Sequence, residues 1–154
     1  VGMVPHLKGV SPLTVVTNAV NVAQELAAAT EAKVILLGGA YSRTSASNLG
    51  PMAENSLAEM TIDVLYLGTQ AFDLEHGLTD TTVEIAQLKR AMIRAARRVV
   101  LLADSAKWET SGFIQVAPLS SIHTLVADEG LPPAARRRIA SLGIEVVIAP
   151  LGRG

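Results

Sequence analysis

Hydrophobic and polar positions along the middle of the chain follow a pattern that predicts a strand, a helix and a second strand. Two short apolar runs, residues 64–67 and residues 99–102, are each followed by a polar segment, as is typical of strands buried in a parallel sheet. Between them, apolar residues recur at steps of three and four from Val83 to Ala96, which predicts an amphipathic helix. Residues 63–108 are therefore predicted to form one right-handed βαβ unit.

A capping pattern predicts where this helix begins. Thr81 and Glu84 have the spacing of a capping box, in which a hydroxyl and a carboxylate accept hydrogen bonds from N–H groups of the first turn. Four arginines lie largely off the apolar stripe, and we expect the helix to extend far enough to carry Arg97 and Arg98. Their ordinary role is a solvated helix face.

The rest of the chain alternates strands and helices. Strands are predicted at residues 13–17, 33–37, 113–116, 123–127 and 145–148, and helices at residues 19–29, 51–60 and from 132 to about 142. Thr17 or Asn18 is the natural N-cap of the first helix. Residues 41–48 are small and polar and are expected to form a loop or a short edge strand, and residues 1–12 show no clear element. The order predicts an α/β fold with a mainly parallel sheet.

Two polar segments follow strands of the central unit, at residues 68–80 and residues 104–107. Open parallel sheets bind ligands beyond the carboxyl ends of their strands. Both segments are expected to be polar loops that open on the same edge of the sheet. We therefore expect a ligand site at this edge.

Length and composition favour one domain spanning residues 1–154. The chain is 49% hydrophobic, enough for a full core, and contains no cysteine, which excludes disulfides and thiol chemistry. No apolar run approaches the ~18 residues of a membrane span, and no segment resembles a signal peptide. The default expectation is a soluble cytoplasmic protein with no membrane partner.

Charge is distributed unevenly along the sequence. Residues 1–80 carry three Lys or Arg against eight Asp or Glu, whereas residues 81–154 carry ten against six, although the net charge is only −1. The basic residues concentrate on predicted helices. Because aromatic residues make up only 3% of the chain and no groove-reading element is evident, direct nucleic-acid binding is disfavoured.

Four positions near the amino-terminal strands could bind an anion. Thr17 and Asn18 lie at a strand end and a helix start, where unpaired N–H groups favour negative charge, and Gly38 and Gly39 allow close approach of backbone. The alternative is an ordinary N-cap followed by a tight turn. Both interpretations remain open on spacing alone.

Two lysines are further candidates. Lys107 follows a strand and a polar turn, so its ammonium could reach a ligand anion, or it could pair with Asp104 or Glu109. Lys89 lies one turn beyond Glu84 on the central helix and is either an exposed ion-pair partner or a second phosphate or hydroxyl contact.

Carboxylates gather in the segment that begins at Gly68. Asp73, Glu75, His76 and Asp80 could hydrogen-bond sugar hydroxyls or, in an isomerase, move protons; a solvated loop is the simpler interpretation. No metal or cofactor is expected, because the three histidines show no paired ligand spacing. Trp108 could stack on a sugar ring, although packing is its more common role.

Seven short motifs, in order, resemble the C-terminal effector domain of DeoR-type bacterial transcriptional repressors. They are Val16-Thr17-Asn18, Leu37-Gly38-Gly39, Leu49-Gly50-Pro51, Leu67-Gly68, Phe72-Asp73 with Gly77-Leu78, Lys89-Arg90-Ala91-Met92, and Ala103-Asp104-Ser105-Ala106-Lys107-Trp108. The resemblance covers nearly the whole chain. It implies a single three-layer Rossmann-like domain related to ribose-5-phosphate isomerase, a phosphorylated sugar or related metabolite as effector, and a homo-oligomer.

The resemblance also implies parts that are not in this sequence. A family member carries an N-terminal winged helix-turn-helix that binds operator DNA, and a Ser/Gly-Thr-Thr phosphate loop shortly before the stretch that matches residues 13–18. This chain begins at Val1 without methionine, and we expect it to be a fragment that reaches DNA only through the missing domain. The expected ligand-binding residues are Thr17, Asn18, Gly38, Gly39, Gly68, Asp73, Lys89 and Lys107.

Two other functions remain open. An aldose–ketose phosphate isomerase on the same fold resembles this chain around residues 104–107, but its catalytic glutamate aligns near Lys89. A lysine there would retain an anion site and lose the proton-transfer group, so we expect no enzyme activity. A scaffold for oligomerisation with a vestigial pocket is the third interpretation.

Overall fold

The computed structural model describes residues 2–150, and the chain divides into two compact units, residues 1–56 (unit 1) and residues 57–154 (unit 2). Each unit is described separately below. Both contain helices and parallel strands, so the predicted α/β class with mainly parallel sheets is confirmed and is consistent with a Rossmann-like domain. The assignment of the whole chain to one effector-binding domain stays a prediction.

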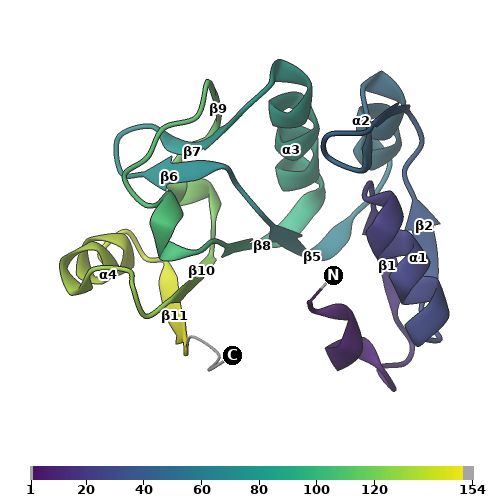
Figure 1. The fold of residues 1–154 in the computed structure, drawn as a ribbon, viewed down its shortest axis with the longest axis horizontal. Helices are drawn as coiled ribbons and strands as arrows, with labels where there is room; N and C mark the ends of the chain where they lie inside the picture. Colours follow the sequence, from purple (N-terminus) through teal and green to yellow (C-terminus); the bar gives the residue numbers. More distant parts are fainter. Residues whose placement is uncertain (1, 151–154) are drawn as a thin grey trace. The chain divides into compact units, whose positions relative to one another are not determined.

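Unit 2 is organised around a four-stranded parallel sheet (Figure 1). Its strands are β5 (Ile62–Leu67), β8 (Ala96–Leu102), β10 (Thr124–Asp128) and β11 (Glu145–Ala149), in the order β11-β10-β8-β5. Helix α3 (Val83–Ala95) connects β5 to β8, and α4 (Pro133–Ala140) connects β10 to β11. The predicted βαβ unit is therefore present.

Unit 2 also contains an antiparallel sheet, built from two strands of the β5–β8 crossover and one strand of the connection from β8 to β10. It consists of β6 (Ala71–Asp73), β7 (Gly77–Asp80) and β9 (Ile114–Ala117), in the order β6-β7-β9. The expectation of a polar loop at residues 68–80 is wrong, because Phe72 and Leu78 are fully buried and pair across a hairpin. Its turn needs Gly77, which has φ +71° and no room for a Cβ beside the carbonyl of Ala117.

One hydrophobic core fills unit 2 on one face of the four-stranded sheet. Strand residues Leu67, Leu101 and Leu125 meet Ala86 of α3 and Ile139 of α4 there, all of them buried. Side chains at alternate positions of the same strands point to the other face, because the side-chain period of a strand is two. A strand residue therefore belongs to the core only if it lies at one of the alternate positions whose side chains face the helices.

The boundaries of α3 differ from those expected. Thr82, one residue after the predicted cap, accepts a hydrogen bond from the N–H of Ile85 at 3.3 Å. The helix ends at Ala95, so the placement of Arg97 and Arg98 on a helix is wrong: both lie on β8, where Arg98 is opposite Val64 of β5. Pairing with β5 outweighs the helical tendency of this segment.

Unit 1 contains a smaller parallel pair, β1 (Thr14–Thr17) and β2 (Lys33–Leu36), joined by α1 (Val20–Ala29). A short 3₁₀ helix, η1 (Val4–Leu7), precedes β1; Val1 lies outside the described residues. Residues 41–48, expected as a loop or edge strand, largely form a hairpin of β3 (Ala40–Ser42) and β4 (Ser47–Leu49). Helix α2 (Pro51–Ala58) begins in unit 1 and ends in unit 2.

Candidate functional site

The candidate site of unit 2 lies at the carboxyl ends of β5 and β8. These strands are parallel neighbours, so Gly68 and Asp104, which follow them, lie on the same edge of the sheet as expected. The N–H of Glu109 donates to the carbonyl of Phe72 at 3.0 Å, and the rings of Phe72 and Trp108 meet edge to face at 5.3 Å. The β6-β7 hairpin and the turn η2 (Ser105–Lys107) are therefore packed together, and Trp108 is a buried packing residue.

Lys89 connects this edge to helix α3. Its ammonium donates to the carbonyl of Gly68 at 2.7 Å and forms an ion pair with the carboxylate of Asp80. The Lys89 side chain is 20% exposed and that of Asp80 7%, so the pair is largely shielded from water. An ammonium has three donors, and these two acceptors leave one for a further partner. Of the predicted site residues, Gly68 and Lys89 are in direct contact.

Asp73 holds the turn between β6 and β7. Its carboxylate accepts hydrogen bonds from the N–H groups of Glu75 and His76, at 2.8 and 2.5 Å, and lies 3.1 Å from the His76 ring. Partial burial opposes ionisation, but the hydrogen bonds from His76 and Glu75 outweigh it and lower the pKa of Asp73. The carboxylate of Asp73 is therefore already engaged by hydrogen bonds within its own turn.

Lys107 is the last residue of η2 and lies partly exposed. Its ammonium is 3.8 Å from the carboxylate of Asp104, which is one of the two pairings that the sequence left open. This is a long ion pair between partly exposed groups, and such pairs contribute little to stability. The lysine can therefore exchange Asp104 for another anion at low cost.

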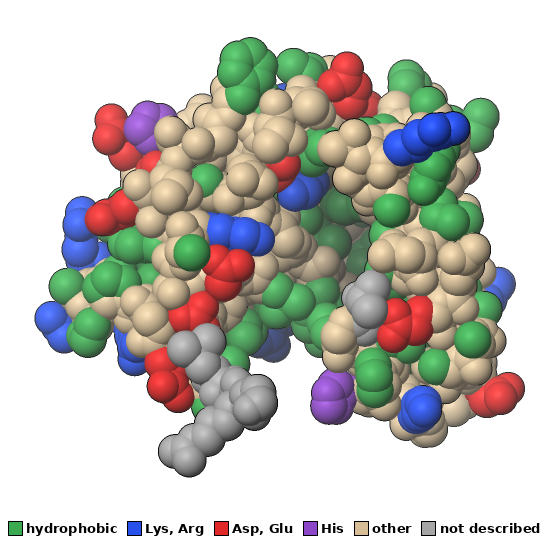
Figure 2. Space-filling view, viewed as in Figure 1, with side chains coloured by type: hydrophobic (Ala, Val, Ile, Leu, Met, Phe, Trp, Pro, Cys, Tyr) green, Lys and Arg blue, Asp and Glu red, His purple; other side chains and the backbone are tan. Residues whose placement is uncertain are grey.

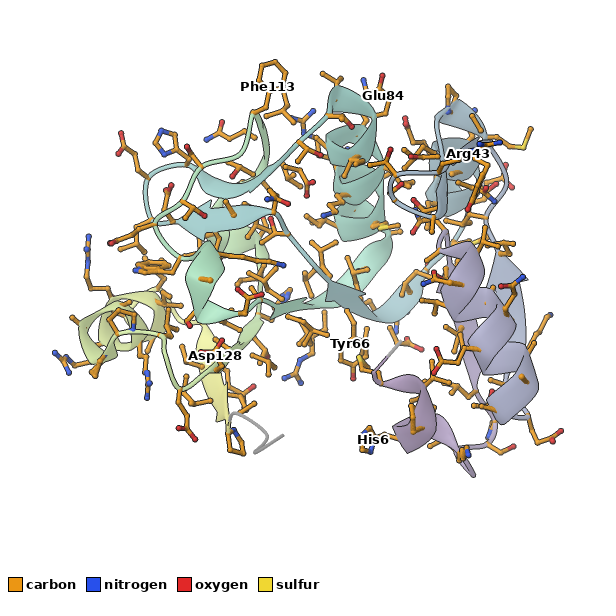
Figure 3. All side chains as sticks on the ribbon, viewed as in Figure 1. His6, Arg43, Tyr66, Glu84, Phe113 and Asp128 are labelled. Atoms are coloured by element: carbon orange, nitrogen blue, oxygen red, sulfur yellow. The ribbon has the colours of Figure 1, made fainter. Side chains whose placement is uncertain are left out.

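Asp128, at the carboxyl end of β10, was not among the predicted site residues. Its carboxylate accepts hydrogen bonds from the N–H of Ser105 at 2.7 Å and the N–H of Gly130 at 2.8 Å, and Figure 3 labels its position. The Ser105 hydroxyl, the Ser105 N–H and the Gly130 N–H together lower the pKa of Asp128. An aspartate at the carboxyl end of a parallel strand was the signal that could have identified it.

The candidate residues of unit 1 lie at the carboxyl ends of β1 and β2. The side-chain amide of Asn18 donates to the backbone carbonyl of Asn48 at 3.2 Å, and the backbone carbonyl of Asn18 accepts from the N–H of Asn48 at 2.8 Å. Asn48 also donates to the carbonyl of Leu37 at 2.8 Å, and sequence reasoning did not identify this residue. Neither Thr17 nor Asn18 is the N-cap of α1; Ala19 occupies that position, and the Thr17 hydroxyl accepts from its N–H at 3.1 Å.

The two glycines of this segment differ in how closely they are packed. Gly39 has φ +130°, and a Cβ there would lie 2.4 Å from the carbonyl oxygen of Leu49. A Cβ on Gly38 would lie 2.6 Å from the sulfur of Met52. The β3-β4 hairpin therefore requires glycine at position 39 whether or not a ligand approaches, whereas the exposed Met52 side chain can move to make room at position 38.

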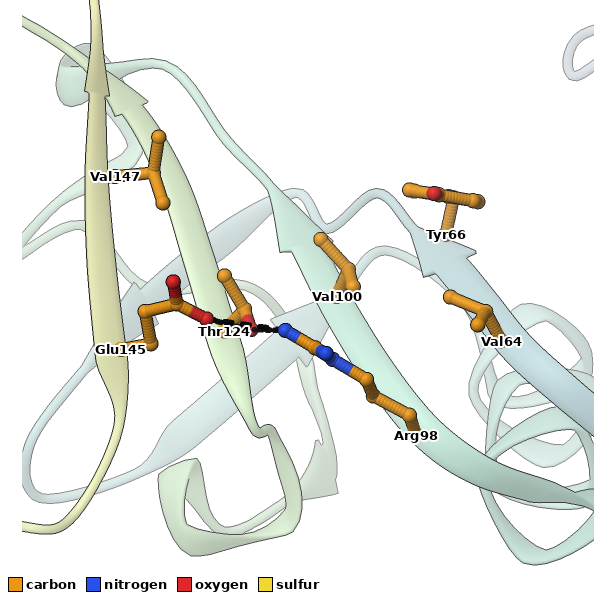
Figure 4. A pocket seen from close by; sticks show the side chains of 7 residues that line it. All are labelled: Val64, Tyr66, Arg98, Val100, Thr124, Glu145 and Val147. Atoms are coloured by element: carbon orange, nitrogen blue, oxygen red, sulfur yellow. Dashed lines mark hydrogen bonds and ion pairs between the residues drawn. The ribbon is translucent and has the colours of Figure 1, made fainter. Parts of the chain in front are cut away.

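Unit 2 also has a shallow cavity of about 290 Å³ on the face of the four-stranded sheet opposite the core (Figure 4). Arg98 crosses it and donates to Thr124 and Glu145, at 2.9 and 3.0 Å. Its other walls include Val64 and Tyr66, which are 39% and 53% exposed. None of the predicted site residues lines it.

Three further features bear on function. Within residues 2–150, no cluster of three or more His, Cys, Asp or Glu side chains is arranged to hold a metal ion. No helix in that range is long and apolar enough to cross a membrane. On the face shown in Figure 2, basic side chains are scattered among acidic and apolar ones.

The fold and the polar strand ends define the class as an α/β domain of the Rossmann-like type. More particularly, the chain belongs to the DeoR C-terminal sensor domain family, whose model matches residues 1–129.

The chain is also similar to several curated transcriptional regulators. The chain is 34% identical over 141 residues to an uncharacterized HTH-type transcriptional regulator of Bacillus subtilis, covering 92% of this chain and 55% of the relative. It is 33% identical over 132 residues to a putative aga operon transcriptional repressor of Escherichia coli, covering 86% and 49%. It is 35% identical over 121 residues to an L-fucose operon activator of Haemophilus influenzae, covering 79% and 49%. The chain thus spans about half the length of these relatives.

Proposed function

We propose that this chain is the effector-sensing part of a DeoR-type transcriptional repressor. It binds a phosphorylated sugar or a related metabolite, and binding changes the DNA affinity of an N-terminal helix-turn-helix domain outside this chain. The family membership supports the sensing role. The names of an aga operon repressor and an L-fucose operon activator among the relatives support sugar metabolism as the regulated process.

The observation that carries the proposal is the position of Lys89. Its ammonium is fixed by Gly68 and Asp80 at the carboxyl end of β5, where open parallel sheets bind their ligands. The remaining donor of Lys89 and the ammonium of Lys107 offer two positive groups for a phosphate or hydroxyl. Asp73 stays a predicted ligand contact in unit 2, although its carboxylate already accepts hydrogen bonds within its own turn. Thr17, Asn18, Gly38 and Gly39 are proposed separately, as neutral groups at the strand ends of unit 1.

An isomerase function is less well supported. Aldose–ketose isomerisation needs a carboxylate that is free to accept a proton from substrate. The carboxylates of Asp73 and Asp80 are held by hydrogen bonds and by the Lys89 ion pair, respectively. We therefore propose a non-enzymatic sensor. Conversion of ribose 5-phosphate by this chain, abolished in Asp73→Asn, would contradict that proposal.

Ligand binding is tested by a thermal-shift screen against a panel of sugar phosphates. The screen uses the 154-residue chain and a longer version that includes the natural sequence before Val1, because part of the phosphate site is expected there. A ligand at a hundred times its Kd adds about 2.7 kcal/mol of stability. We expect one compound to stabilise the protein, and Lys107→Ala to reduce this effect.

The matched control is Lys33→Ala, which removes an exposed lysine at the amino end of β2. It should leave the stabilisation unchanged. If no compound stabilises either version of the protein, the scaffold interpretation replaces the sensor. If only the longer version responds, the preceding segment is needed for binding.

We also propose that the intact regulator is a cytoplasmic homo-oligomer without a membrane partner. Light scattering of the longer version, with and without the stabilising sugar phosphate, tests the oligomeric state. A monomer under both conditions would contradict this part of the proposal.

A further inference from the structure

The turn that carries Lys107 is held from a neighbouring strand. Asp128 ends β10, and its carboxylate accepts the N–H of Ser105, the first residue of η2, at 2.7 Å. Backbone bonds continue the same connection, since the N–H of Ala103 donates to the carbonyl of Val126 at 3.1 Å. The position of η2 relative to the sheet therefore depends on the end of β10 as well as on β8.

The loop after β10 is shaped to keep this carboxylate in place. The N–H of Gly130 donates to the second oxygen of Asp128 at 2.8 Å, so the two oxygens are held by different donors. A Cβ on Gly130 would lie 2.4 Å from the Ser105 hydroxyl oxygen, so the loop and the turn are in close contact. Both hydrogen bonds favour the ionised form, in agreement with the lowered pKa of Asp128.

Lys107 has no comparable support of its own. Its side chain contacts only Asp104 among the charged groups described, at 3.8 Å, and Asp104 belongs to the same turn. The direction of the ammonium is therefore set by where the turn itself lies. A shift of Ser105 would move Asp104 and Lys107 together.

We propose that Asp128 is a positioning residue for Lys107: by fixing Ser105 and Gly130, it places the η2 turn so that the lysine faces the ligand edge. This rests on the proposed function, in which Lys107 contacts the effector. Asp128 acts through the turn and does not itself contact the effector. In this way β10, the neighbour of β8 in the parallel sheet, contributes to a site that is otherwise built from β5 and β8.

The test compares Asp128→Asn with Asp63→Asn, a control at an 88% exposed aspartate near the amino end of β5. An asparagine keeps the size of the side chain but has one acceptor oxygen for two N–H donors. Amide hydrogen exchange at Ser105 and Gly130, followed by NMR, reports directly on the turn. Asp128→Asn should accelerate this exchange about tenfold, the effect of losing one hydrogen bond, while the control leaves it unchanged.

A double-mutant cycle then separates positioning from general weakening of the fold. Affinity for the sugar phosphate that stabilises the chain most, and for inorganic phosphate, is measured with Asp128→Asn alone, with Lys107→Ala alone and with both. If Asp128 acts through Lys107, it weakens binding about tenfold in the native background and has little effect in the Lys107→Ala background. An equal effect in both backgrounds, or no effect in either, would overturn the proposal.

Failure of the proposed function gives a different result. In that case neither the unchanged chain nor its longer version binds any sugar phosphate. Hydrogen exchange then tests by itself whether Asp128 fixes the turn that carries Lys107: faster exchange at Ser105 in Asp128→Asn supports this, and unchanged exchange overturns it.

Discussion

The two units differ in the chemistry at the carboxyl ends of their parallel strands. In unit 2, Lys89 and Lys107 are paired with carboxylates, and the carboxylate of Asp128 is held by N–H donors. In unit 1, the corresponding positions carry no formal charge, and their contacts are amide and backbone hydrogen bonds, such as those between Asn18 and Asn48. Charged groups that are already held in place reduce the entropy lost when a ligand binds. Neutral hydrogen-bond donors can orient a ligand at little electrostatic cost.

The units also differ in how they are stabilised. The hydrophobic core cluster lies in unit 2, whereas the buried hydrophobic residues among residues 2–56, such as Leu26 and Leu37, lie outside it. Segments with few buried apolar contacts open more readily than the core of a domain. We therefore expect unit 1 to exchange its amide protons faster than unit 2.

The largest effect should come from truncating a core leucine in each unit. Leu125→Ala in unit 2 should lower the free energy of unfolding by about 2–5 kcal/mol, because it removes a fully buried side chain and leaves a cavity. Leu26→Ala in unit 1 is the matched variant, at 1% exposure. Amide exchange should accelerate across unit 2 in the first and mainly within residues 2–56 in the second. Equal acceleration in both units by Leu26→Ala would show that they unfold together.

Breaking the Asp80–Lys89 pair should have the next largest effect. Lys89→Met leaves the Asp80 carboxylate, 7% exposed, without its cation and should cost about 2 kcal/mol, less than for a fully buried pair because Lys89 is 20% exposed. Chemical denaturation measures this change. The double variant with Asp80→Asn should recover part of the loss. Asp63→Asn, in an exposed pair with Arg97, should change stability by less than about 0.5 kcal/mol.

Substitution of two adjacent threonines tests which of them is the N-cap of α3. Thr82→Ala should lower the free energy of unfolding by about 1 kcal/mol, because the Thr82 hydroxyl accepts the Ile85 N–H. Thr81→Ala should have an effect below about 0.5 kcal/mol. Thermal unfolding of both variants measures the difference, and the opposite order would restore the cap expected from the sequence.

Acid should remove a smaller contribution from Asp73. Its pKa is lowered from 3.8 in the folded chain, so its stabilisation is present above that value and is lost as pH falls through the folded pKa. The stability difference between the native chain and Asp73→Asn should therefore be constant near neutral pH and shrink in acid below about pH 4. A difference that grows on acidification would contradict the depressed pKa.

Much of the fold could be read from the sequence because buried parallel strands leave continuous apolar runs. Residues 99–102 are an example, and the structure places them in β8. The β6-β7 hairpin was missed because Asp73, Glu75 and His76 made the segment look like a loop. Its buried positions, Phe72 and Leu78, are too few to give a clear alternation.

The site was harder to predict because its contacts join distant parts of the sequence. Lys89 reaches Gly68 across 21 positions, and Asp128 reaches Ser105 across 23. The periodicity of apolar residues identifies where strands end, but it does not show which side chains meet at those ends. The role of the eight predicted ligand residues stays a prediction, and the contacts of Asp128 and Asn48 were identified from the structure.

The edge-to-face contact of Trp108 with Phe72 has a spectroscopic consequence. Trp108 is the only tryptophan in the chain, and it is 9% exposed where the β6-β7 hairpin meets the η2 turn. Its intrinsic fluorescence therefore reports on this junction without any label. A change in emission on adding a sugar phosphate would locate the response at the hairpin and turn of unit 2, and its concentration dependence would give an affinity from the protein's own signal.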